Sequence, residues 1–461
     1  MTNNNIPQQN SIELTEEFLK LFKLIETTNE NVFVTGRAGT GKSTFLSYFR
    51  SKTRKKTVTL APTGLAAVNV EGQTIHSFFR FPPRMLDPKD VRKLYNPVYR
   101  NLDTILIDEI PMVRADLFDA IDIFMRKNGK DYTKPFGGAQ IVLFGDLFQL
   151  PPVVENEALA ILRMRYASRY FFSSKAFQQM NLNVVELPKV FRQHDPKFIE
   201  ALDKIRRGNI LSNDLEIFNR RVIKDYKPDD SEFCITLTPT NKIANLKNQE
   251  KLNEIAGEPI TYIAKLTGDF EANPKNLPVD LELRLKVGAR VIFVKNDTAG
   301  EFVNGTLGIV SDLGTDWVKV RIEENGEPVT VKAMTWEKIK YNYDRENDII
   351  VDEITGKLTQ IPLRLAWALT IHKSQGLTFD NVFLDFSFAP WEHGHTYVAL
   401  SRCRSIEGTV LNNKLYPNDV VVDSKVTDFV QLNGNKDVWR HLRKDEQSSL
   451  HKFNSDESNE K

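Results

Sequence analysis

The sequence predicts an α/β protein with two doubly wound parallel sheets, a small insertion in the first α/β unit and a small β-barrel inserted in the second. Three observations support this fold class. The N-terminal part alternates short apolar runs with helical patterns, as a parallel sheet with crossover helices requires. A second α/β pattern begins after residue 187. The stretch 257–362 is instead rich in β-branched residues, punctuated by glycine and nearly free of helical periodicity.

The first α/β unit is expected over residues 1–184, with a small insertion at about 79–100. An amphipathic helix is predicted from Leu14 to Glu26, ahead of an apolar strand, a glycine-rich turn and a further helix. Its predicted strands are 32–35, 57–61, 104–107 and 141–144. In such sheets ligands bind beyond the carboxyl ends of the strands. The residues found there are expected to form one site: Gly36–Ser43, Asp108 with Glu109, and Gly145 with Asp146.

The second α/β unit is expected over 185–256 and 363–432, with strands at 234–237, 382–384 and 409–411. Between its two parts lies the predicted barrel, residues 257–362. The predicted barrel strands are 289–294, 305–310, 317–322 and 329–331. Residues 433–461 are polar and charge-rich, which is typical of a C-terminal tail.

Composition excludes several classes of protein. The 461 residues are 41% hydrophobic and 27% charged, with a formal net charge of +1, so the chain is globular and carries no overall basic field. Cys234 and Cys403 are too few for a disulfide framework or a zinc module. We find no targeting signal and no apolar run near the ~20 residues that cross a bilayer. These features predict a cytoplasmic protein without a membrane partner.

Residues 36–43 read Gly-Arg-Ala-Gly-Thr-Gly-Lys-Ser, a complete GxxxxGKS pattern between a predicted strand and a predicted helix. The backbone N–H groups of such a loop cradle phosphates. Its lysine, here Lys42, reaches the β and γ phosphates, and the hydroxyl of Ser43 ligates Mg²⁺. The alternative is a chance glycine-rich turn, which the flanking pattern disfavours.

Asp108 and Glu109 end the predicted strand 104–107. One carboxylate would bind the metal and the other would orient or deprotonate a water, which indicates nucleotide hydrolysis. The alternative is a strand that ends in two solvated acids. Asn241-Lys242-Ile243-Ala244 has Ala where a guanine-reading Asp would stand, so ATP is the expected nucleotide.

Further motifs resemble the Pif-type branch of superfamily 1 DNA helicases, relatives of RecD. They are APTGLAA (61–67), TIHSFF (74–79), FGGAQIVLFGDLFQLPPV (136–153), LPKVFRQ (187–193), TPTN (238–241), LAWALTIHKSQGLTFD (365–380) and YVALSRCR (397–404). The resemblance spans most of residues 31–410. It implies two RecA-like lobes and a 5′-to-3′ DNA helicase driven by ATP and Mg²⁺. The compact chain and the lack of an organelle-targeting signal indicate a bacterial or phage origin.

The resemblance also assigns the site. The implied catalytic residues are Lys42, Asp108, Glu109, Gln149, Arg192 and Arg402, with Ser43 and Asp108 on the metal. Gln149 would sense the γ-phosphate, and the two arginines would stabilise the transferring phosphoryl group from the second lobe. The nucleotide-binding residues are Gly36, Arg37, Ala38, Gly39, Thr40, Gly41, Lys42, Ser43, Thr44, Gln375 and Gly376.

A path for single-stranded DNA across both lobes is carried over from the same motifs: Pro62, Thr63, His76, Ser77, Phe78, Thr240, Asn241, His372, Lys373 and Ser374. Phe78 fits base stacking and a core position equally well. The family's adenine-reading Gln is absent, because Phe18 stands at its place. The alternatives are that Gln8 or Gln9 reads adenine, or that shape and stacking hold it. His393 and His395 lack further ligands at metal spacing and are expected to be structural.

The predicted function is therefore an ATP-dependent DNA helicase and translocase that unwinds duplex or structured DNA. Its expected partners are single-stranded DNA and single-strand/duplex junctions. G-quadruplexes and RNA–DNA hybrids are left open as substrates, and a monomer is expected in solution. The alternative is a nucleotide-gated DNA-binding remodeller that does not separate strands. A metabolite kinase does not account for the second lobe.

Overall fold

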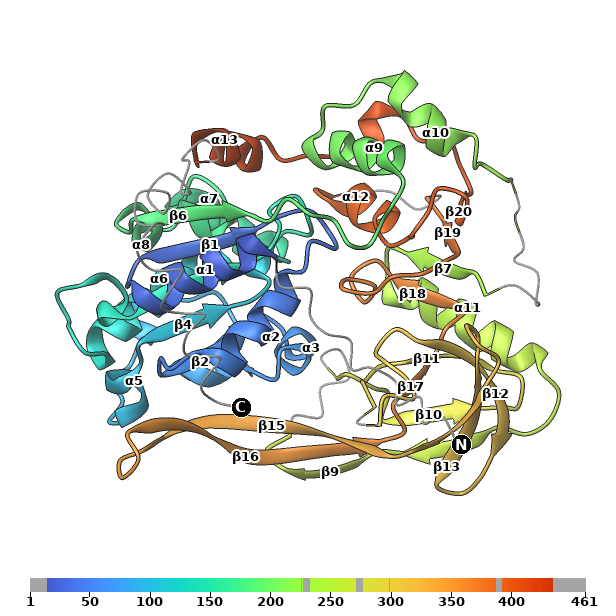
Figure 1. The fold of residues 1–461 in the computed structure, drawn as a ribbon, viewed down its shortest axis with the longest axis horizontal. Helices are drawn as coiled ribbons and strands as arrows, with labels where there is room; N and C mark the ends of the chain where they lie inside the picture. The colour runs from blue at the N-terminus through green and yellow to red at the C-terminus, as the bar shows by residue number, and fades with distance from the viewer. Residues whose placement is uncertain are drawn as a thin grey trace, which may run out of the picture.

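The computed structural model describes residues 15–224, 226, 233–270, 277–297, 299–386 and 392–433. Two parallel sheets with their helices and an antiparallel region make up the molecule, so the predicted α/β class is confirmed (Figure 1). The predicted tail beyond Asn433 and the two candidate adenine readers Gln8 and Gln9 lie outside the described residues.

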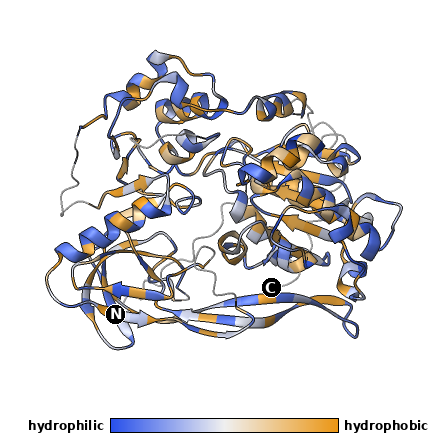
Figure 2. Ribbon diagram, turned by 180° about the vertical axis from the view of Figure 1, so that it is seen from behind, coloured by the Kyte–Doolittle hydropathy of each residue, from blue (hydrophilic) through white to orange (hydrophobic). Residues whose placement is uncertain are grey.

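The first sheet has six parallel strands in the order β3-β2-β4-β5-β1-β6. They are β1 Asn31–Thr35, β2 Thr57–Ala61, β3 Gln73–Thr74, β4 Thr104–Ile107, β5 Gln140–Phe144 and β6 Leu182–Glu186. β4 and β5 are buried along their whole length, because helices cover both faces of the sheet. The strands of this sheet accordingly show as mostly orange in Figure 2.

Alternate side chains of the first sheet belong to two different cores. Val32 and Val34 pack with helices α1 (Glu16–Thr27) and α2 (Lys42–Lys52), whereas Phe33 packs with α6 (Ala115–Asn128) on the opposite face. The helices are α1 Glu16–Thr27, α2 Lys42–Lys52, α3 Gly64–Asn69, α4 Ile75–Phe79, α5 Pro97–Asn101, α6 Ala115–Asn128, α7 Asn156–Arg165 and α8 Lys175–Gln178. The phosphate-loop helix α2 thus lies on the α1 side of the sheet.

The second sheet has four parallel strands in the order β18-β7-β19-β20. They are β7 Ile235–Thr238, β18 Ala368–Thr370, β19 Val382–Leu384 and β20 Thr409–Leu411. The helices of this part are α9 Pro196–Arg207, α10 Glu216–Asn219, α11 Asn241–Glu254 and α12 His395–Leu400. Its core includes Ala38 and Leu150 from the first α/β unit, so the two units meet at the ends of their sheets.

Residues 260–365 form three antiparallel sheets. Five strands pair in the order β14-β13-β12-β11-β17, two as β10-β8, and three as β15-β16-β9. The strands are β8 Ile260–Ile263, β9 Lys265–Gly268, β10 Glu282–Leu285, β11 Arg290–Phe293, β12 Leu307–Leu313, β13 Trp317–Ile322, β14 Pro328–Lys332, β15 Met334–Asp344, β16 Ile349–Gln360 and β17 Leu363–Leu365.

The β15–β16 hairpin extends away from the other antiparallel strands and reaches the first sheet (Figure 1). The buried Tyr341 hydroxyl accepts a hydrogen bond from the backbone N–H of Thr59 at 3.1 Å, beside the edge of β2. At the hairpin tip, Lys56 and Asp348 form an ion pair of 2.6 Å. The hairpin therefore connects the antiparallel region to the first α/β unit.

Helix α13, Ser424–Asn433, follows the second sheet in the chain but lies against the first α/β unit (Figure 1). Phe429 stacks on Phe172, with ring centroids 4.5 Å apart, and Tyr170 donates a hydrogen bond to Asp423 at 3.1 Å. Among the residues described, no helix has the length and apolar character needed to span a membrane.

Candidate nucleotide site and nucleic-acid path

The glycine-rich loop between β1 and α2 is a tight turn closed by its own lysine. Lys42 Nζ donates hydrogen bonds to the carbonyl oxygens of Gly36 at 2.8 Å and Arg37 at 2.9 Å. Gly39 has a φ of +77°, and a Cβ there would lie 2.5 Å from Cβ of Arg192. Glycine is required at this position because the loop meets the segment that carries Arg192.

A pocket of about 430 Å³ opens over this loop. The lining residues are Phe18, Ala38, Gly39, Thr40, Gly41, Lys42, Ser43, Thr44, Glu109, Gln149, Phe191, Arg192, Gly376 and Arg402. Five of the six implied catalytic residues line it, and the sixth, Asp108, is buried next to Glu109. Gly36, Arg37 and Gln375 are not part of the lining. The sequence motifs thus come together from both α/β units.

The acidic pair lies where β4 ends. Burial raises the pKa of Asp108. Burial also raises the pKa of Glu109, and the negative charge of Asp108 raises it further. Burial lowers the pKa of Lys42, and the nearby carboxylates, of which Asp146 contributes most, only partly offset this. Anionic phosphate groups are therefore the natural partners of the lysine in this site.

Two arginines face the pocket from the side of the second sheet. Arg192 donates to the carbonyl oxygens of Ser401 and Gly376, both at 3.2 Å, and burial lowers its pKa to about 10. Arg402 is 1% exposed and donates to the Val398 carbonyl at 2.9 Å, while burial and the charge of Arg192 lower its pKa. Two buried cations on one pocket wall make this wall suited to an anion.

Gln149 lies in a turn that follows β5. Its backbone N–H donates to the Asp146 carbonyl at 2.9 Å, and its side chain is 7% exposed and faces the pocket. From the second unit, Gly394 packs against this turn so closely that a Cβ would lie 2.6 Å from the Gln149 carbonyl oxygen. His393 Nε2 contacts the carbonyl oxygen of Leu147 in the same turn at 2.7 Å.

The predicted nucleic-acid path is only partly exposed. Thr63 and Thr240 cap the N-termini of α3 and α11, and Asn241 is exposed beside Thr240. The other partly accessible members are Pro62, His76, Ser77, His372 and Lys373. His372 packs edge-on against His395, with ring centroids 5.6 Å apart.

Two members of that predicted path are buried in this structure. Phe78 is 5% exposed and packs against Phe79, Tyr99 and Tyr341, so its ring is a core group here. Ser374 is 0% exposed, and its hydroxyl donates to the Ile371 carbonyl at 2.8 Å. The helical environment of TIHSFF satisfies apolar packing first, and the turn in HKSQG uses the serine internally.

Of the two histidines expected to be structural, His393 uses both ring nitrogens in hydrogen bonds with the backbone. His393 accepts a hydrogen bond at Nδ1 from the Asp423 backbone N–H at 2.9 Å, which leaves Nε2 to donate to Leu147. The described residues hold no group of three or more His, Cys, Asp or Glu that could bind a metal ion. A metal ion at the phosphate loop would therefore also need ligands other than His, Cys, Asp and Glu side chains.

Sequence reasoning missed three residues of the site. Phe191 lines the pocket opposite Phe18, and both rings lie near Gly41. Tyr397 accepts a hydrogen bond from the Ala38 backbone N–H at 2.8 Å, which ties α12 to the phosphate loop. Arg206 forms an ion pair with Asp146, which belongs to the same turn as Gln149. Phe191 and Tyr397 belong to recognised motifs, whereas Arg206 lies in a polar helix that carries no signal.

Two models of known protein families match separate parts of this chain. Residues 13–216 match the model of the PIF1-like helicase family, and residues 365–405 match the UvrD-like helicase C-terminal domain. The chain is similar to the ATP-dependent DNA helicase Pif1 of Bdellovibrio bacteriovorus, with 32% identity over 433 residues that cover 91% of this chain and 92% of the relative.

Among solved structures, Pif1 from Bacteroides sp in complex with ADP-AlF4 is 36% identical and superposes with a TM-score of 0.84, covering 93% of this chain and 98% of that one. Bacteroides Pif1 bound to ssDNA is 37% identical, with a TM-score of 0.65 over 92% of this chain and 97% of that one. Unliganded Pif1 from Bacteroides sp superposes with a TM-score of 0.82, so at nearly equal identity the arrangement of this chain is closer to that of the structures without DNA.

Proposed function

Because the chain belongs to the PIF1-like helicase family and is an ATP-dependent DNA helicase, we propose that it moves 5′ to 3′ along single-stranded DNA and opens single-strand/duplex junctions. The single observation that carries this proposal is the pocket over the phosphate loop, which both α/β units line. A nucleotide held there contacts groups from both sides, so binding and release change the relation of the two units.

We assign the chemistry as follows. Lys42 and the backbone N–H groups of residues 36–44 hold the phosphates. Glu109 takes a proton from the attacking water, which displaces ADP from the γ-phosphoryl group and yields inorganic phosphate. Arg192 and Arg402 stabilise charge on the transferring group, and Gln149 contacts the γ-phosphate.

The residues present also fit Mg²⁺. The hydroxyl of Ser43 is at the exposed start of α2 and the carboxylate of Asp108 follows β4, and both are oxygen donors of the kind that Mg²⁺ prefers. When bound, Mg²⁺ neutralises charge on the β and γ phosphates. The remaining ligands would be phosphate oxygens and water, in keeping with the absence of a carboxylate cluster among the described residues.

Single-stranded DNA is proposed to follow the exposed and half-buried residues of the predicted path, Pro62, Thr63, His76, Ser77, Thr240, Asn241, His372 and Lys373. Short polar groups and helix N-termini at Thr63 and Thr240 suit phosphate contacts without base reading. The Pif1 structure with ssDNA superposes less well, at 0.65, which supports a rearrangement on DNA binding. Described residues of a single chain line the pocket from both α/β units, so we propose that a monomer is sufficient for hydrolysis.

The test is ATP-driven unwinding of two partial duplexes that differ only in whether the overhang is 5′ or 3′, with Lys42→Ala as the inactive control. Unwinding confined to the 5′ overhang supports the proposal. Unwinding confined to the 3′ overhang overturns the polarity, and unwinding of neither, despite DNA-stimulated ATPase, overturns strand separation in favour of a nucleotide-gated remodeller.

A further inference from the structure

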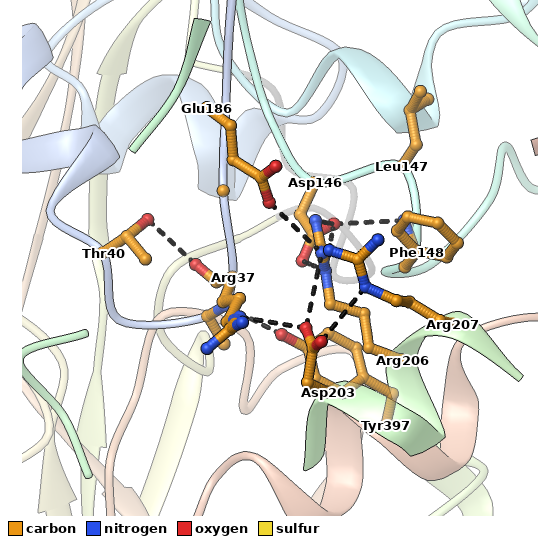
Figure 3. Close-up of polar contacts among 12 residues, drawn as sticks. Arg37, Thr40, Asp146, Leu147, Phe148, Glu186, Asp203, Arg206, Arg207 and Tyr397 are labelled. Atoms are coloured by element: carbon orange, nitrogen blue, oxygen red, sulfur yellow. Dashed lines mark hydrogen bonds and ion pairs between the residues drawn. The ribbon is translucent and has the colours of Figure 1, made fainter. Parts of the chain in front are cut away.

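A buried ion pair between Arg206 and Asp146 joins the two α/β units, and the carboxylate of Glu186 lies 3.4 Å from the same guanidinium (Figure 3). Arg206 lies in the last turn of α9, and Asp146 follows β5. Arg206 Nη2 donates to Asp146 Oδ1 at 3.0 Å, and Nε lies 3.1 and 3.2 Å from the two carboxylate oxygens. The side chains are 3% and 0% exposed. This is a charge-assisted contact with almost no access to water.

Arg206 is held by the second unit. The apolar face of α9, with Phe198, Leu202 and Ile205, packs in the core of the second sheet. The same segment carries Arg192 shortly before α9 begins. A displacement of this core relative to the first sheet therefore moves the guanidinium of Arg206 together with that of Arg192.

Asp146 shapes the turn that presents Gln149. Its Oδ1 accepts a hydrogen bond from the Phe148 backbone N–H at 3.2 Å, and its carbonyl accepts one from Gln149 N–H at 2.9 Å. The Arg206 guanidinium also lies 4.7 Å from the centre of the Phe148 ring. Arg206 thus contacts the carboxylate of Asp146 and the aromatic ring of Phe148, which both belong to the turn and precede Gln149.

The charges around Asp146 link the pair to the phosphate site. Burial raises the pKa of Asp146, but the positive charges of Arg206 and Lys42 outweigh it and lower this pKa below the usual range. The carboxylate therefore stays ionised between the phosphate-loop lysine and the α9 arginine. Phosphate binding changes the environment of Lys42, and Asp146 is the carboxylate with the largest effect on that lysine.

We propose that Arg206 is a positioning residue for ATP hydrolysis: through Asp146 and Phe148 it holds the turn so that Gln149 meets the γ-phosphate only when α9 is in place. The inference rests on the proposed role of Gln149. Arg206 touches no reacting atom, so its effect is on the geometry of the glutamine. Hydrolysis is thereby tied to the same movement that brings in Arg192.

Buried ion pairs are often replaceable by neutral groups without loss of stability, whereas loss of one partner leaves an unpaired charge. A neutral pair can therefore restore stability without restoring kcat, and this outcome separates a positioning role from a purely structural one. The variants are Arg206→Met, Asp146→Asn and their combination, with Arg206→Lys as the conservative change. The amide introduced by Asp146→Asn keeps an oxygen for the Phe148 N–H. Arg207→Met is the control on the same helix, since it removes the Arg207–Asp203 pair of 3.1 Å but leaves the Arg37–Asp203 pair of 2.9 Å and the Arg206–Asp146 pair in place.

The assay is DNA-stimulated ATPase of the full chain with kcat and KM determined separately, alongside the melting temperature. We expect Arg206→Met to lower kcat at least about tenfold with KM for ATP within about threefold, and the double variant to regain the melting temperature without regaining kcat. Arg206→Lys should recover part of kcat, and Arg207→Met should match the wild type. Recovery of kcat together with stability in the double variant would overturn the proposal.

Gln149→Ala, measured in the same assay, separates this inference from the function on which it rests. A wild-type kcat for Gln149→Ala overturns the role of the glutamine itself, whatever Arg206 does. A low kcat for Gln149→Ala with an unchanged kcat for Arg206→Met overturns only the positioning role.

Discussion

Replacement of Gly394 by alanine should slow hydrolysis by separating the two α/β units at the Gln149 turn. Gly394 has a φ of +77°, where a side chain adds about 1 to 2 kcal/mol of strain. The new Cβ would lie 2.6 Å from the Gln149 carbonyl oxygen and 2.7 Å from that of Phe148. Because an ordinary C···O contact is about 3.3 Å, the turn has to retreat by roughly 0.7 Å.

A displacement of this size at a catalytic turn is expected to lower kcat roughly 10- to 100-fold, or about 1.4 to 2.7 kcal/mol in activation free energy. Affinity for single-stranded DNA is measured beside kcat, because Gly394 precedes His395, which packs against His372 of the proposed path. The measurement is steady-state ATPase with saturating oligonucleotide, together with fluorescence anisotropy of a labelled strand.

Gly326 offers a matched control. Its φ is +72°, and no atom lies within 4 Å of a Cβ built there, so Gly326→Ala introduces the same backbone strain without the contact. We expect this variant to lose stability only. If Gly394→Ala and Gly326→Ala hydrolyse ATP at the same rate, the contact with the Gln149 turn has no role in catalysis and the reasoning fails.

Three further predictions follow from individual contacts. Arg402→Ala should reduce kcat far more than nucleotide affinity, because the arginine acts on the transition state; Arg402→Lys distinguishes this from misfolding, and a pure affinity defect would contradict it. Burial and the neighbouring His372 lower the pKa of His395 to about 4, so its contribution to stability is complete above about pH 6.5 and is lost as the pH falls towards 4, by up to about 3 kcal/mol. His395→Gln should flatten that part of the urea-denaturation profile against pH, and an unchanged slope would refute the assignment. Tyr341→Phe should lower the free energy of unfolding by about 1 to 3 kcal/mol, because it leaves the Thr59 N–H buried without an acceptor; an unchanged melting temperature would contradict this.

The strands of both parallel sheets were largely predictable, because a buried parallel strand is a short apolar run between polar residues. The predicted 57–61, 104–107, 382–384 and 409–411 coincide with β2, β4, β19 and β20. The short β3 and the edge strand β6 were not predicted, and β18, Ala368–Thr370, was missed because its apolar pattern lies inside a motif that was interpreted for its chemistry. The local sequence pattern predicts that a segment is a strand, whereas the strands that it pairs with depend on the whole fold.

The nucleotide site was predictable for a different reason. Its residues follow strand ends, so sheet topology alone brings Lys42, Glu109 and Gln149 together. Arg206 was not predictable, because a charged residue on a helix is usually solvated and only the position of α9 buries this one. Phe78 shows the reverse, since an aromatic residue in a functional motif belongs to the core.

The long hairpin and α13 were also beyond reach of the sequence. β15 and β16 alternate apolar and polar residues as any exposed hairpin does, and nothing local shows that Tyr341 docks at β2. The contact joins segments far apart in the chain. Such pairings are decided by shape and burial in the finished molecule.

The position of α13 has a consequence for synthesis of the chain on the ribosome. Phe172 emerges about 250 residues before Phe429, which is roughly 10 to 50 s at about 5 to 20 residues per second. During that interval the aromatic cluster of the first unit lacks its cover, although its sheet is already complete in sequence. Until α13 has been synthesised, nascent chains of this protein thus expose the apolar side chains that Phe429 later covers.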